Sequence, residues 1–536
     1  NGGVLNPAQK CLTTFLCMIK MKTEVCIPIT AETIKQAIAD LKKAEKLVNL
    51  VELRIDYIKN IDENKLKKLL EKKAKKVIVT CRPKKLCGHF DGNEEKRIGL
   101  LKKAIELNAD LIDIEMESNK DMIKKIISNK NNAAIIVSSH NFNETPNSRK
   151  LNNIYNEIKK LNPDLIKIVT NANSINDNFT IFELLKNKRG LIAFCMGIRG
   201  QISRIVAGKY GSRITFASLK EGKESASGQI SIEDMKSAYN INSVNNETKL
   251  VGVIGEFAEN SMSKYMHNAN FKRKKLDFVY MPFKVKKEEL NEFIKNFRKF
   301  GFKGSSVTIP HKVAIMKLID EIDNTAKQIG AVNTIVNDTQ TASGARTKFG
   351  IPQRDTNSVG NGKLVGYNTD YLGAIGALKE KTGLKNKKVL VVGAGGGARA
   401  VVYGLKREGA KITIVNRTAN KAKKLAEDFN VEYDEMRNMK NLIKNNEIII
   451  NATSAGMSPN TNESIINGNN LIKGKMVMDI VYKPTETKLI KLARKAKCSV
   501  ITGDRMLIYQ AIGQFKLWTK QEPDLKSMES ALKKYL

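Results

Sequence analysis

The chain has 536 residues, of which 41% are hydrophobic and 27% are charged. This length excludes a single small module, and this composition excludes a chain that is disordered throughout. The net charge of +37 raises the question of nucleic-acid binding. The lysines are scattered over predicted helix faces, however, so we expect a solvated basic surface and no nucleic-acid partner.

The first segment, residues 1–21, receives no assignment. It begins with Asn1 rather than Met and holds a short apolar patch at 12–19. It is therefore either upstream sequence, with Met18 or Met21 as the true start, or a cut targeting segment. No apolar run approaches the ~20 residues that cross a bilayer, so we expect no membrane partner.

Cysteine and histidine usage bears on the compartment and on metal binding. Seven cysteines without a CxxC pair predict reduced thiols and a cytoplasmic protein, with an organelle-targeting segment lost or truncated at the N-terminus as the alternative. The histidines lack the spacing of metal ligands, so no metal is expected. They are His89, His140, His267 and His311.

Residues 22–241 alternate short β-branched runs with amphipathic helical stretches, which is typical of βα units around a parallel sheet. Eight such runs predict a (β/α)8 barrel, in which the chemistry gathers at the carboxyl ends of the strands. The runs are 24–29, 50–56, 76–82, 111–116, 133–140, 165–170, 191–197 and 214–218.

Unusual polar residues lie at these strand ends. Glu52, Arg54 and Asp56 alternate along the second run, and Asp113 and Glu115 along the fourth, so each set projects to one face, the barrel interior.

Three further polar residues complete this group. Arg82 closes the third run, His140 closes the fifth, and Lys167 lies within the sixth. Any one of them alone would be a buried ion pair or a strand-end polar group. Together, a lone lysine and a lone histidine on adjacent strands supply an amine that can form an iminium and a base that can move protons.

Seven motifs in residues 22–241 resemble those of the type I 3-dehydroquinate dehydratases. They are ELRID at 52–56, TCR at 80–82, DIE at 113–115, SSHNFNETP at 138–146, IKI at 166–168, MGIRGQISR at 196–204 and ESASGQI at 224–230. The resemblance implies that Lys167 forms a Schiff base with 3-dehydroquinate, while His140 carries protons. It also implies a substrate pocket formed by Glu52, Arg54, Arg82, Met196, Arg204, Ser225 and Gln229.

Two positions depart from the family pattern. Leu86 stands where a glutamate usually helps to orient the histidine, so Glu52 and Glu115 become the candidates for orienting His140. Ser227 replaces a proline of the lid loop, which loosens the loop at little cost because proline mainly pre-orders it.

A polar stretch at 241–248, INSVNNET, is expected to be a linker to a second half. There, an apolar strand runs into Gly393-x-Gly395-x-x-Ala398 and then into a helix, which is the context of a dinucleotide fingerprint. The next strand ends at Asn416 and Arg417, with no carboxylate to bind a ribose diol. Arg417 would suit a 2′-phosphate, so we predict NADP(H) as the cofactor.

Ordered motifs through residues 249–536 resemble shikimate dehydrogenase. They are NSMSKYMHN with Ser261 and Ser263, VTIPHK at 307–312, GAVNT at 330–334, GYNTD at 366–370, NATSAGM at 451–457, DIVYKP at 479–484 and GDRMLIYQ at 503–510. Lys264 departs from the pattern, since a proline is usual there. The resemblance implies that Lys312 and Asp370 are the catalytic pair.

The remaining residues implied by this resemblance bind substrate and cofactor. The substrate contacts are Ser261, Ser263, Thr308, Asn333, Tyr482 and Gln510. The cofactor contacts are Gly393, Gly395, Gly396, Gly397, Ala398, Asn416, Arg417, Thr418, Thr453, Met457 and Gly503.

The second half is expected to contain two domains. A substrate-binding α/β domain covers 249–370, with a polar, Gly-rich insertion at 339–361 that we expect to be a disordered loop. A Rossmann domain covers 371–505, and helices in 506–536 pack back on the substrate domain.

The inferred product of the barrel, 3-dehydroshikimate, is the inferred substrate of the second half. The chain is therefore predicted to be a bifunctional shikimate-pathway enzyme of aromatic amino acid (chorismate) biosynthesis, with small-molecule substrates and a homodimer as a candidate assembly. Three alternatives stay open: an NAD-dependent quinate dehydrogenase, a barrel kept only as a scaffold because of Leu86, and a polyanion-binding protein.

Overall fold

The computed structural model describes residues 23–338, 345–346, 352–353 and 362–536. The chain divides into two compact units that meet between Thr248 and Lys249. The segment 1–21 and most of the insertion 339–361 lie outside the described residues. No helix within the described ranges is long and apolar enough to span a membrane.

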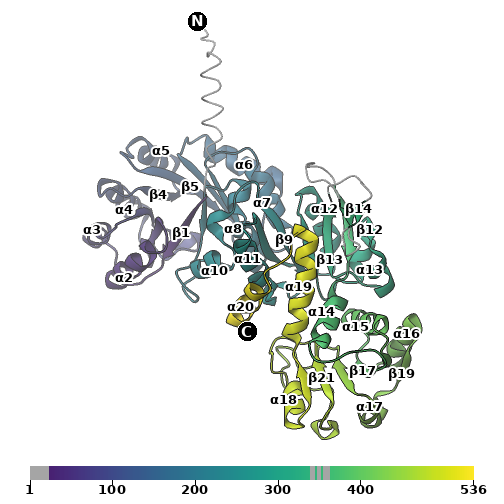
Figure 1. Ribbon diagram of the computed structural model, residues 1–536. Coiled ribbons are helices and arrows are strands. Elements are labelled where there is room, and N and C mark those ends of the chain that lie inside the picture. The colour runs from purple at the N-terminus through teal and green to yellow at the C-terminus, as the bar shows by residue number, and fades with distance from the viewer. Residues whose placement is uncertain (1–22, 339–344, 347–351, 354–361) are drawn as a thin grey trace. The chain divides into compact units, whose positions relative to one another are not determined.

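The first unit is built on eight parallel strands in the order β7-β6-β5-β4-β3-β2-β1-β8. The end strands β7 and β8 contact each other, so the sheet is a nearly closed barrel, as predicted (Figure 1). The strands are β1 (Glu24–Ile29), β2 (Leu50–Arg54), β3 (Lys76–Thr80), β4 (Leu111–Glu115), β5 (Ala134–His140), β6 (Leu165–Asn171), β7 (Leu191–Met196) and β8 (Ile214–Phe216).

Several predicted strands were too long, and for two of them the difference changes the place of a site residue. β2 ends at Arg54, and Asp56 lies in a 3-10 turn, η1 (Ile55–Tyr57), which brings its carboxylate against the Arg54 guanidinium. β3 ends at Thr80, two residues before Arg82. Pro83 follows Arg82 and has no N–H with which to continue a ladder, so the chain turns away there.

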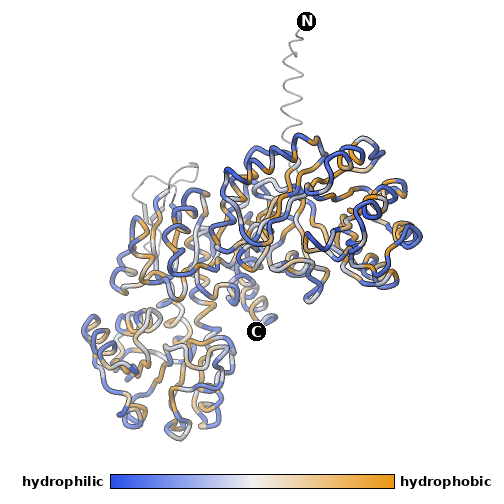
Figure 2. Tube along the Cα trace, turned by 180° about the vertical axis from the view of Figure 1, so that it is seen from behind, coloured by the Kyte–Doolittle hydropathy of each residue, from blue (hydrophilic) through white to orange (hydrophobic). Residues whose placement is uncertain are grey.

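Helices surround the barrel, and several begin at side chains that suit a helix start. Thr33, Asp62, Asn93 and Asn147 each accept a backbone N–H of the first turn. The helices are α2 (Ile34–Glu45), α3 (Glu63–Leu70), α4 (Glu94–Glu106), α5 (Lys120–Ser128), α6 (Ser148–Lys159), α7 (Asp177–Leu185), α8 (Gln201–Ile205), α9 (Ala207–Tyr210) and α10 (Ile232–Ser237), with short turns η2 (Lys84–Leu86), η3 (Ile198–Gly200) and η4 (Ile241–Ser243). Figure 2 shows the strands as the more hydrophobic part of the trace and the helices as the more hydrophilic part.

The barrel interior changes character along the strands. Leu50, Ile78, Ile136, Ile192 and Ile214 belong to one buried apolar cluster near the amino ends of their strands. Two residues further along, the same faces carry polar side chains on β2, β3 and β5, because a strand repeats every second residue. The polar residues therefore lie above an apolar floor, toward the carboxyl ends.

The second unit contains a mixed six-stranded sheet, in the order β10-β9-β11-β13-β16-β12. β13 is antiparallel to both of its neighbours, while the other pairs are parallel. The elements are β9 (Lys249–Gly255), β10 (Phe278–Lys284), β11 (Gly304–Val307), β12 (Glu321–Ile322), β13 (Thr334–Asp338), β16 (Lys363–Tyr367), α11 (Ser263–Arg273), α12 (Leu290–Lys299), α13 (Asn324–Ile329), η5 (Ala258–Asn260) and η6 (Ala314–Lys317). In the insertion, β14 (Ala345–Arg346) pairs with β15 (Pro352–Gln353).

A parallel six-stranded sheet follows in the same unit, in the order β19-β18-β17-β20-β21-β22. Numbered within this sheet, the order is 3-2-1-4-5-6, that of a doubly wound Rossmann fold, which confirms the predicted fold class. Its elements are β17 (Lys388–Val392), β18 (Lys411–Val415), β19 (Glu432–Asp434), β20 (Ile448–Asn451), β21 (Met476–Asp479), β22 (Ser499–Ile501), α14 (Asp370–Lys379), α15 (Gly396–Arg407), α16 (Ala419–Phe429), α17 (Met439–Asn445), α18 (Lys488–Lys495), η7 (Met436–Asn438) and η8 (Gly468–Asn470).

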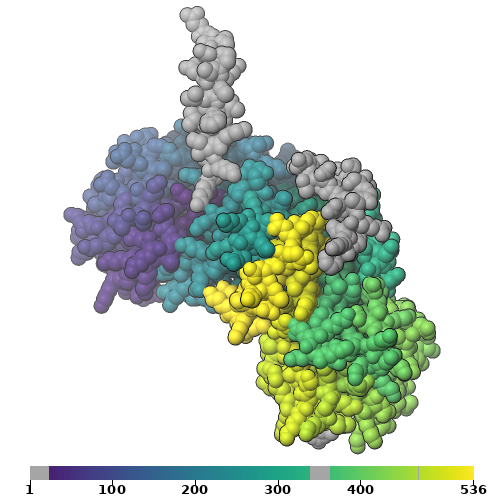
Figure 3. All heavy atoms as spheres, viewed as in Figure 1, coloured from purple at the N-terminus to yellow at the C-terminus, as the bar shows by residue number. Residues whose placement is uncertain are grey.

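The two C-terminal helices, α19 (Gly503–Thr519) and α20 (Leu525–Tyr535), join the core of the substrate sheet. Met506, near the start of α19, belongs to the apolar cluster of the nucleotide-binding sheet, whereas Phe515 and Trp518 belong to that of the substrate sheet. Figure 3 shows these helices in yellow on the surface of the unit. One helix therefore contributes to both cores.

We expect Trp518→Ala to destabilise the second unit by about 3–5 kcal/mol. Trp518 is 2% exposed, its Nε1 donates to the Ile335 carbonyl at 3.0 Å, and a Cβ on Gly304 would lie 2.3 Å from that nitrogen. Urea unfolding followed by circular dichroism measures the change. If only the unfolding transition of the barrel lost stability, this would contradict the placement of Trp518 in the core of the second unit.

Candidate active sites

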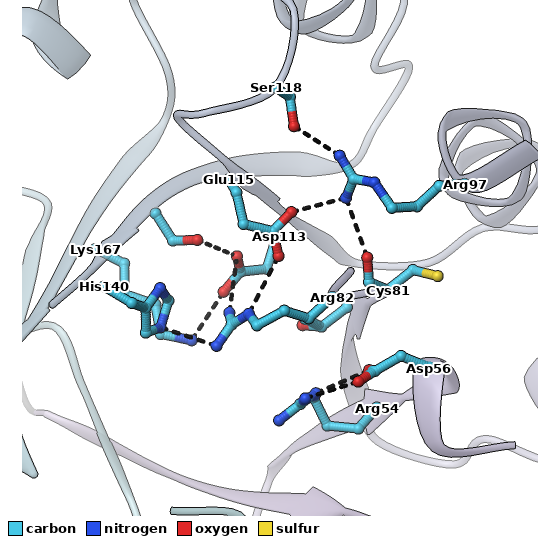
Figure 4. Close-up of polar contacts among 12 residues, drawn as sticks. Arg54, Asp56, Cys81, Arg82, Arg97, Asp113, Glu115, Ser118, His140 and Lys167 are labelled. Atoms are coloured by element: carbon cyan, nitrogen blue, oxygen red, sulfur yellow. Dashed lines mark hydrogen bonds and ion pairs between the residues drawn. The ribbon is translucent and has the colours of Figure 1, made fainter. Parts of the chain in front are cut away.

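The first site centres on the amine of Lys167, which is 4% exposed. Its Nζ donates to Asp113 Oδ2 at 2.8 Å, lies 3.6 Å from Glu52 Oε1, and sits 4.5 Å from the centre of the Phe216 ring (Figure 4). Ser138 donates to the other Asp113 oxygen at 2.6 Å. Burial alone would raise the pKa of Asp113, but Lys167, Arg82 and these hydrogen bonds hold it below its usual value.

His140 is held as a neutral base beside this amine. Arg82 Nη1 lies 3.0 Å from His140 Nε2, and a guanidinium can only donate, so Nε2 carries the lone pair and Nδ1 the proton. Burial, Arg82, Lys167 and Arg54 lower the pKa of His140 well below its usual value. The imidazole is therefore unprotonated at neutral pH.

Of the two candidates for orienting His140, Glu115 reaches the imidazole through Arg82, and neither carboxylate hydrogen-bonds to His140 among the described residues. Glu52 accepts a hydrogen bond from Thr80 at 2.8 Å, and Glu115 accepts one from Arg82 Nε at 3.1 Å. Arg82 is thus the residue that contacts the imidazole, and Glu115 acts through Arg82. Leu86 lies in η2, on the loop that follows Arg82.

Arg97, on α4, is a site-supporting residue that the sequence analysis missed. It is 1% exposed and donates to Glu115 Oε2 at 2.7 Å, to Ser118 Oγ at 2.6 Å and to the Cys81 carbonyl at 3.0 Å. Its position in the sequence could have identified it. The buried stripe of α4 includes residues 97, 100, 101 and 104, and a charged residue is unexpected in such a stripe.

Arg204, on α8, is buried and forms no ion pair with any residue that the structure describes. Its guanidinium carbon lies 4.3 Å over the Phe194 ring, and within the described chain nothing hydrogen-bonds to its Nε or Nη2. Burial lowers the pKa of Arg204 to about 10. Phe194 in turn lies 5.5 Å from Phe216, the ring beneath Lys167. A buried guanidinium with unused donors fits an incoming carboxylate.

The predicted lid residues are tied to the end of β7, which closes with the buried Met196. Gly197 N–H donates to the Ser227 carbonyl at 2.9 Å, and a Cβ on Gly228, at φ +75°, would lie 2.1 Å from the Gly197 oxygen. Gln229 Oε1 accepts the Ser225 N–H at 2.8 Å. The loop is therefore held to the end of β7 by a backbone hydrogen bond and by the close approach of Gly228.

The second unit brings together the predicted pair Lys312 and Asp370. Lys312 Nζ donates to Asp370 Oδ2, and Asn333 Nδ2 donates to Asp370 Oδ1 at 2.8 Å. Thr308 lies just after β11, four residues before Lys312. Asp370 is the first residue of α14, where the helix dipole stabilises a carboxylate.

The expected substrate contacts lie on neighbouring elements. The Ser263 N–H donates to Ser261 Oγ at 3.3 Å, and burial raises the pKa of Tyr482 against the opposing effect of Ser261. Gln510, on α19, is buried against Gly373, one turn after Asp370 in α14.

The glycine fingerprint fits a dinucleotide. Gly393 has φ +122°, and a Cβ there would lie 2.8 Å from the Ala452 carbonyl. Gly395 precedes the twelve-residue α15, and in the described chain no side chain caps the first N–H groups of this helix. These N–H groups can bind a pyrophosphate. A Cβ on Gly396 would lie 3.5 Å from Lys312 Cδ, so the fingerprint borders the predicted catalytic pair.

The other predicted cofactor contacts lie around this turn. Ala398 is buried in α15, and Gly397 faces Ile480. Asn416, Arg417 and Thr418 follow β18, with Arg417 exposed and no carboxylate among the three. Thr453 Oγ1 donates to Asn451 at 2.7 Å, Met457 is 41% exposed, and Gly503 opens α19 against the Val481 carbonyl. Within the described residues, no group of three His, Cys, Asp or Glu side chains could hold a metal ion.

These constellations define the class of protein: a barrel lyase with an amine nucleophile, joined to a dinucleotide-dependent dehydrogenase. Family models match in the same order along the chain. They are Type I 3-dehydroquinase over residues 25–246, Shikimate dehydrogenase substrate binding domain over 253–335, Shikimate / quinate 5-dehydrogenase over 376–490 and Shikimate 5′-dehydrogenase C-terminal domain over 505–533.

Relatives match the chain in whole and in part. The chloroplastic bifunctional 3-dehydroquinate dehydratase/shikimate dehydrogenase of Arabidopsis thaliana is 34% identical over 94% of this chain and 83% of its own. Shikimate dehydrogenase (NADP(+)) of Methanocaldococcus jannaschii is 41% identical over 54% of this chain and 98% of its own. A solved shikimate dehydrogenase from Aquifex aeolicus is 36% identical over 54% of this chain and 99% of that chain, with a TM-score of 0.48.

The chain belongs to the family of bifunctional 3-dehydroquinate dehydratase/shikimate dehydrogenases. It is a multifunctional enzyme of the shikimate pathway, with a lyase activity and an oxidoreductase activity.

We expect Arg82→Met to raise the pKa of His140 toward the usual value of about 6.5, because it removes the cation nearest to the imidazole. An NMR titration of the imidazole, with His89 as the reference resonance in the same unit, measures the shift. An unchanged titration of His140 in the variant would show that Arg82 does not control its protonation.

Proposed function

We propose that the two units carry out consecutive reactions with the residues described above. The first unit dehydrates 3-dehydroquinate to 3-dehydroshikimate, and the second reduces 3-dehydroshikimate to shikimate with NADPH. The observation that carries the proposal is the buried Lys167 amine, which lies between two carboxylates beside a neutral His140.

In the barrel, Lys167 gives up one proton, and its amine attacks the C3 ketone carbon. The resulting carbinolamine loses water and becomes an iminium. The positive charge stays at Nζ, where Asp113 and Glu52 already stabilise a cation. The iminium makes the C2 proton acidic, and His140 removes it to leave an enamine.

The enamine electrons then expel the C1 hydroxyl, which takes the proton from His140 and leaves as water. A second water hydrolyses the iminium of the product and releases the Lys167 amine. Arg204 supplies unused donors for the substrate carboxylate. Arg54, Arg82, Ser225 and Gln229 are the proposed hydroxyl contacts, while Glu52 and Met196 line the pocket.

In the second unit, bound NADPH supplies hydride to the carbonyl carbon. Lys312 donates the proton that the oxygen takes up, and Asp370 holds the ammonium in place. Ser261 and Ser263 would bind the substrate carboxylate, with Thr308, Asn333, Tyr482 and Gln510 around the ring.

The proposal includes three domain limits, which are 22–241, 249–370 and 371–505. It also includes a cytoplasmic location, a homodimeric assembly, and the absence of nucleic-acid and membrane partners. The division of the chain at Thr248 and Lys249 supports the first limit. Light scattering and cell fractionation test the assembly and the location. Retention on heparin at physiological salt would argue for a polyanion partner.

We expect Lys167→Ala to reduce dehydration by about 10⁴-fold or more, since it removes the nucleophile, and to leave NADPH-dependent reduction unchanged. Lys312→Ala should lower reduction by about 10²-fold to 10⁴-fold and spare dehydration. Each activity is assayed separately, and borohydride trapping with mass spectrometry detects the adduct on Lys167. Loss of both activities from one substitution would contradict independent sites.

We expect Arg417→Ala to raise the KM for NADPH by about 10-fold to 100-fold, the value of one or two hydrogen bonds to a phosphate. The KM for NADH should change little, because NADH has no 2′-phosphate. Steady-state kinetics with both cofactors measure the difference. A wild-type preference for NAD with quinate would instead establish a quinate dehydrogenase.

A further inference from the structure

A line of buried polar side chains runs through the second unit and ends at Asp370. Tyr280 Oη lies 2.8 Å from Ser306 Oγ, which lies 2.9 Å from Gln514 Oε1. Gln514 Nε2 lies 3.1 Å from Thr334 Oγ1, and Thr334 Oγ1 lies 2.7 Å from Asn333 Oδ1. Asn333 Nδ2 then donates to Asp370 Oδ1 at 2.8 Å.

The direction of each hydrogen bond in this line follows from backbone groups whose chemistry is unambiguous. Gln514 Nε2 also faces the Asn333 carbonyl at 3.3 Å, which can only accept, so this end of the amide is the NH₂ group. Asn333 Oδ1 receives the Thr369 N–H at 2.8 Å, which can only donate, so Asn333 Nδ2 must face Asp370.

The hydroxyls are then fixed in turn, since each has one proton to donate. Thr334 accepts from Gln514 and therefore passes its proton to Asn333 Oδ1. Ser306 gives its proton to Gln514 Oε1, so Tyr280 must donate to Ser306. Every hydrogen bond in the line therefore donates toward the Asp370 carboxylate, because each amide accepts at its oxygen and donates onward from its nitrogen.

The surroundings argue against a purely structural role. Phe515 and Trp518 on α19 and Val336 on β13 belong to one buried apolar cluster, so the helix and the strand that carry Gln514 and Thr334 pack together through apolar side chains. Apolar side chains of similar size would fill this space without the desolvation cost of buried amides and hydroxyls. The far end of the line also lies near the predicted substrate clamp, because Ser263 opposes the rise that burial gives to the pKa of Tyr280.

We propose that Thr334 and Gln514 are positioning residues for the reduction: they lock the Asn333 amide so that it holds Asp370, and through Asp370 they aim the Lys312 ammonium at the carbonyl oxygen. This inference rests on the proposed roles of Lys312 and Asp370. Neither Thr334 nor Gln514 is expected to touch the substrate.

Thr334→Val tests the proposal, because valine keeps the shape and removes the hydroxyl. We expect kcat for reduction to fall about tenfold, the effect of one lost hydrogen bond, while the KM values for 3-dehydroshikimate and NADPH stay within about twofold. Thr334→Ser restores the hydroxyl and should recover most of kcat. Emission of Trp518, the single tryptophan of the chain, reports whether this unit is folded.

Ser305→Ala is the matched control. Ser305 is a buried residue on β11 whose Oγ lies 3.0 Å from the Gly252 carbonyl oxygen and 2.9 Å from the Ser306 carbonyl oxygen. Its hydroxyl is outside the line of side chains, so its removal should leave kcat unchanged. The proposal would be overturned if Thr334→Val left kcat for reduction unchanged. It would also be overturned if Thr334→Ser or Ser305→Ala lowered kcat as much as Thr334→Val does. Full reduction by Lys312→Ala would overturn the proposed function itself.

Discussion

The structure of the barrel site depends on one constraint: a lysine ammonium with its own counter-ion is buried above an apolar floor. Lys167 and Asp113 lie on β6 and β4, with β5 between them, so the ion pair spans three strands. Burying these charges is costly unless their donors and acceptors find partners. The surrounding side chains supply most of these partners, although Arg82 Nη2 has no hydrogen-bond partner among the described residues. Ser138 uses the second Asp113 oxygen, and Glu52 and Arg82 supply the remaining charges.

The same requirement extends outward from Arg82. Its contact with Glu115 leaves one carboxylate oxygen, which Arg97 occupies from α4. Burial raises the pKa of Glu115 against the opposing effect of the two arginines. His140 is thereby held by the Arg82 guanidinium. Arg82 in turn is positioned by Glu115, whose carboxylate lies between Arg82 and Arg97. This arrangement orients His140, although the position where a glutamate is usual holds Leu86, which cannot accept a hydrogen bond.

Much of the fold and of the sites could be predicted from the sequence, for physical reasons that differ between elements. The alternation of Glu52 and Arg54 within an apolar run identified an inward face, because the period of a strand is local. The strand period did not apply to Asp56, because Asp56 lies in the turn η1, where its carboxylate pairs with Arg54. Arg97 and Gln514 act through contacts with residues distant in the sequence, and nothing in their neighbourhoods along the chain specifies those partners.

The path of α19 sets an order of assembly during synthesis. The barrel is complete once residue 248 has left the ribosome, since its strands are contiguous in the chain. The substrate sheet begins at Lys249, yet part of its apolar core, including Phe515, Trp518 and Leu532, is translated only after the whole nucleotide-binding sheet. Between the end of β16 at Tyr367 and the start of α19 at Gly503 lie 135 residues, and until they are made one apolar face of this sheet stays uncovered, as in the folding intermediates that chaperones bind.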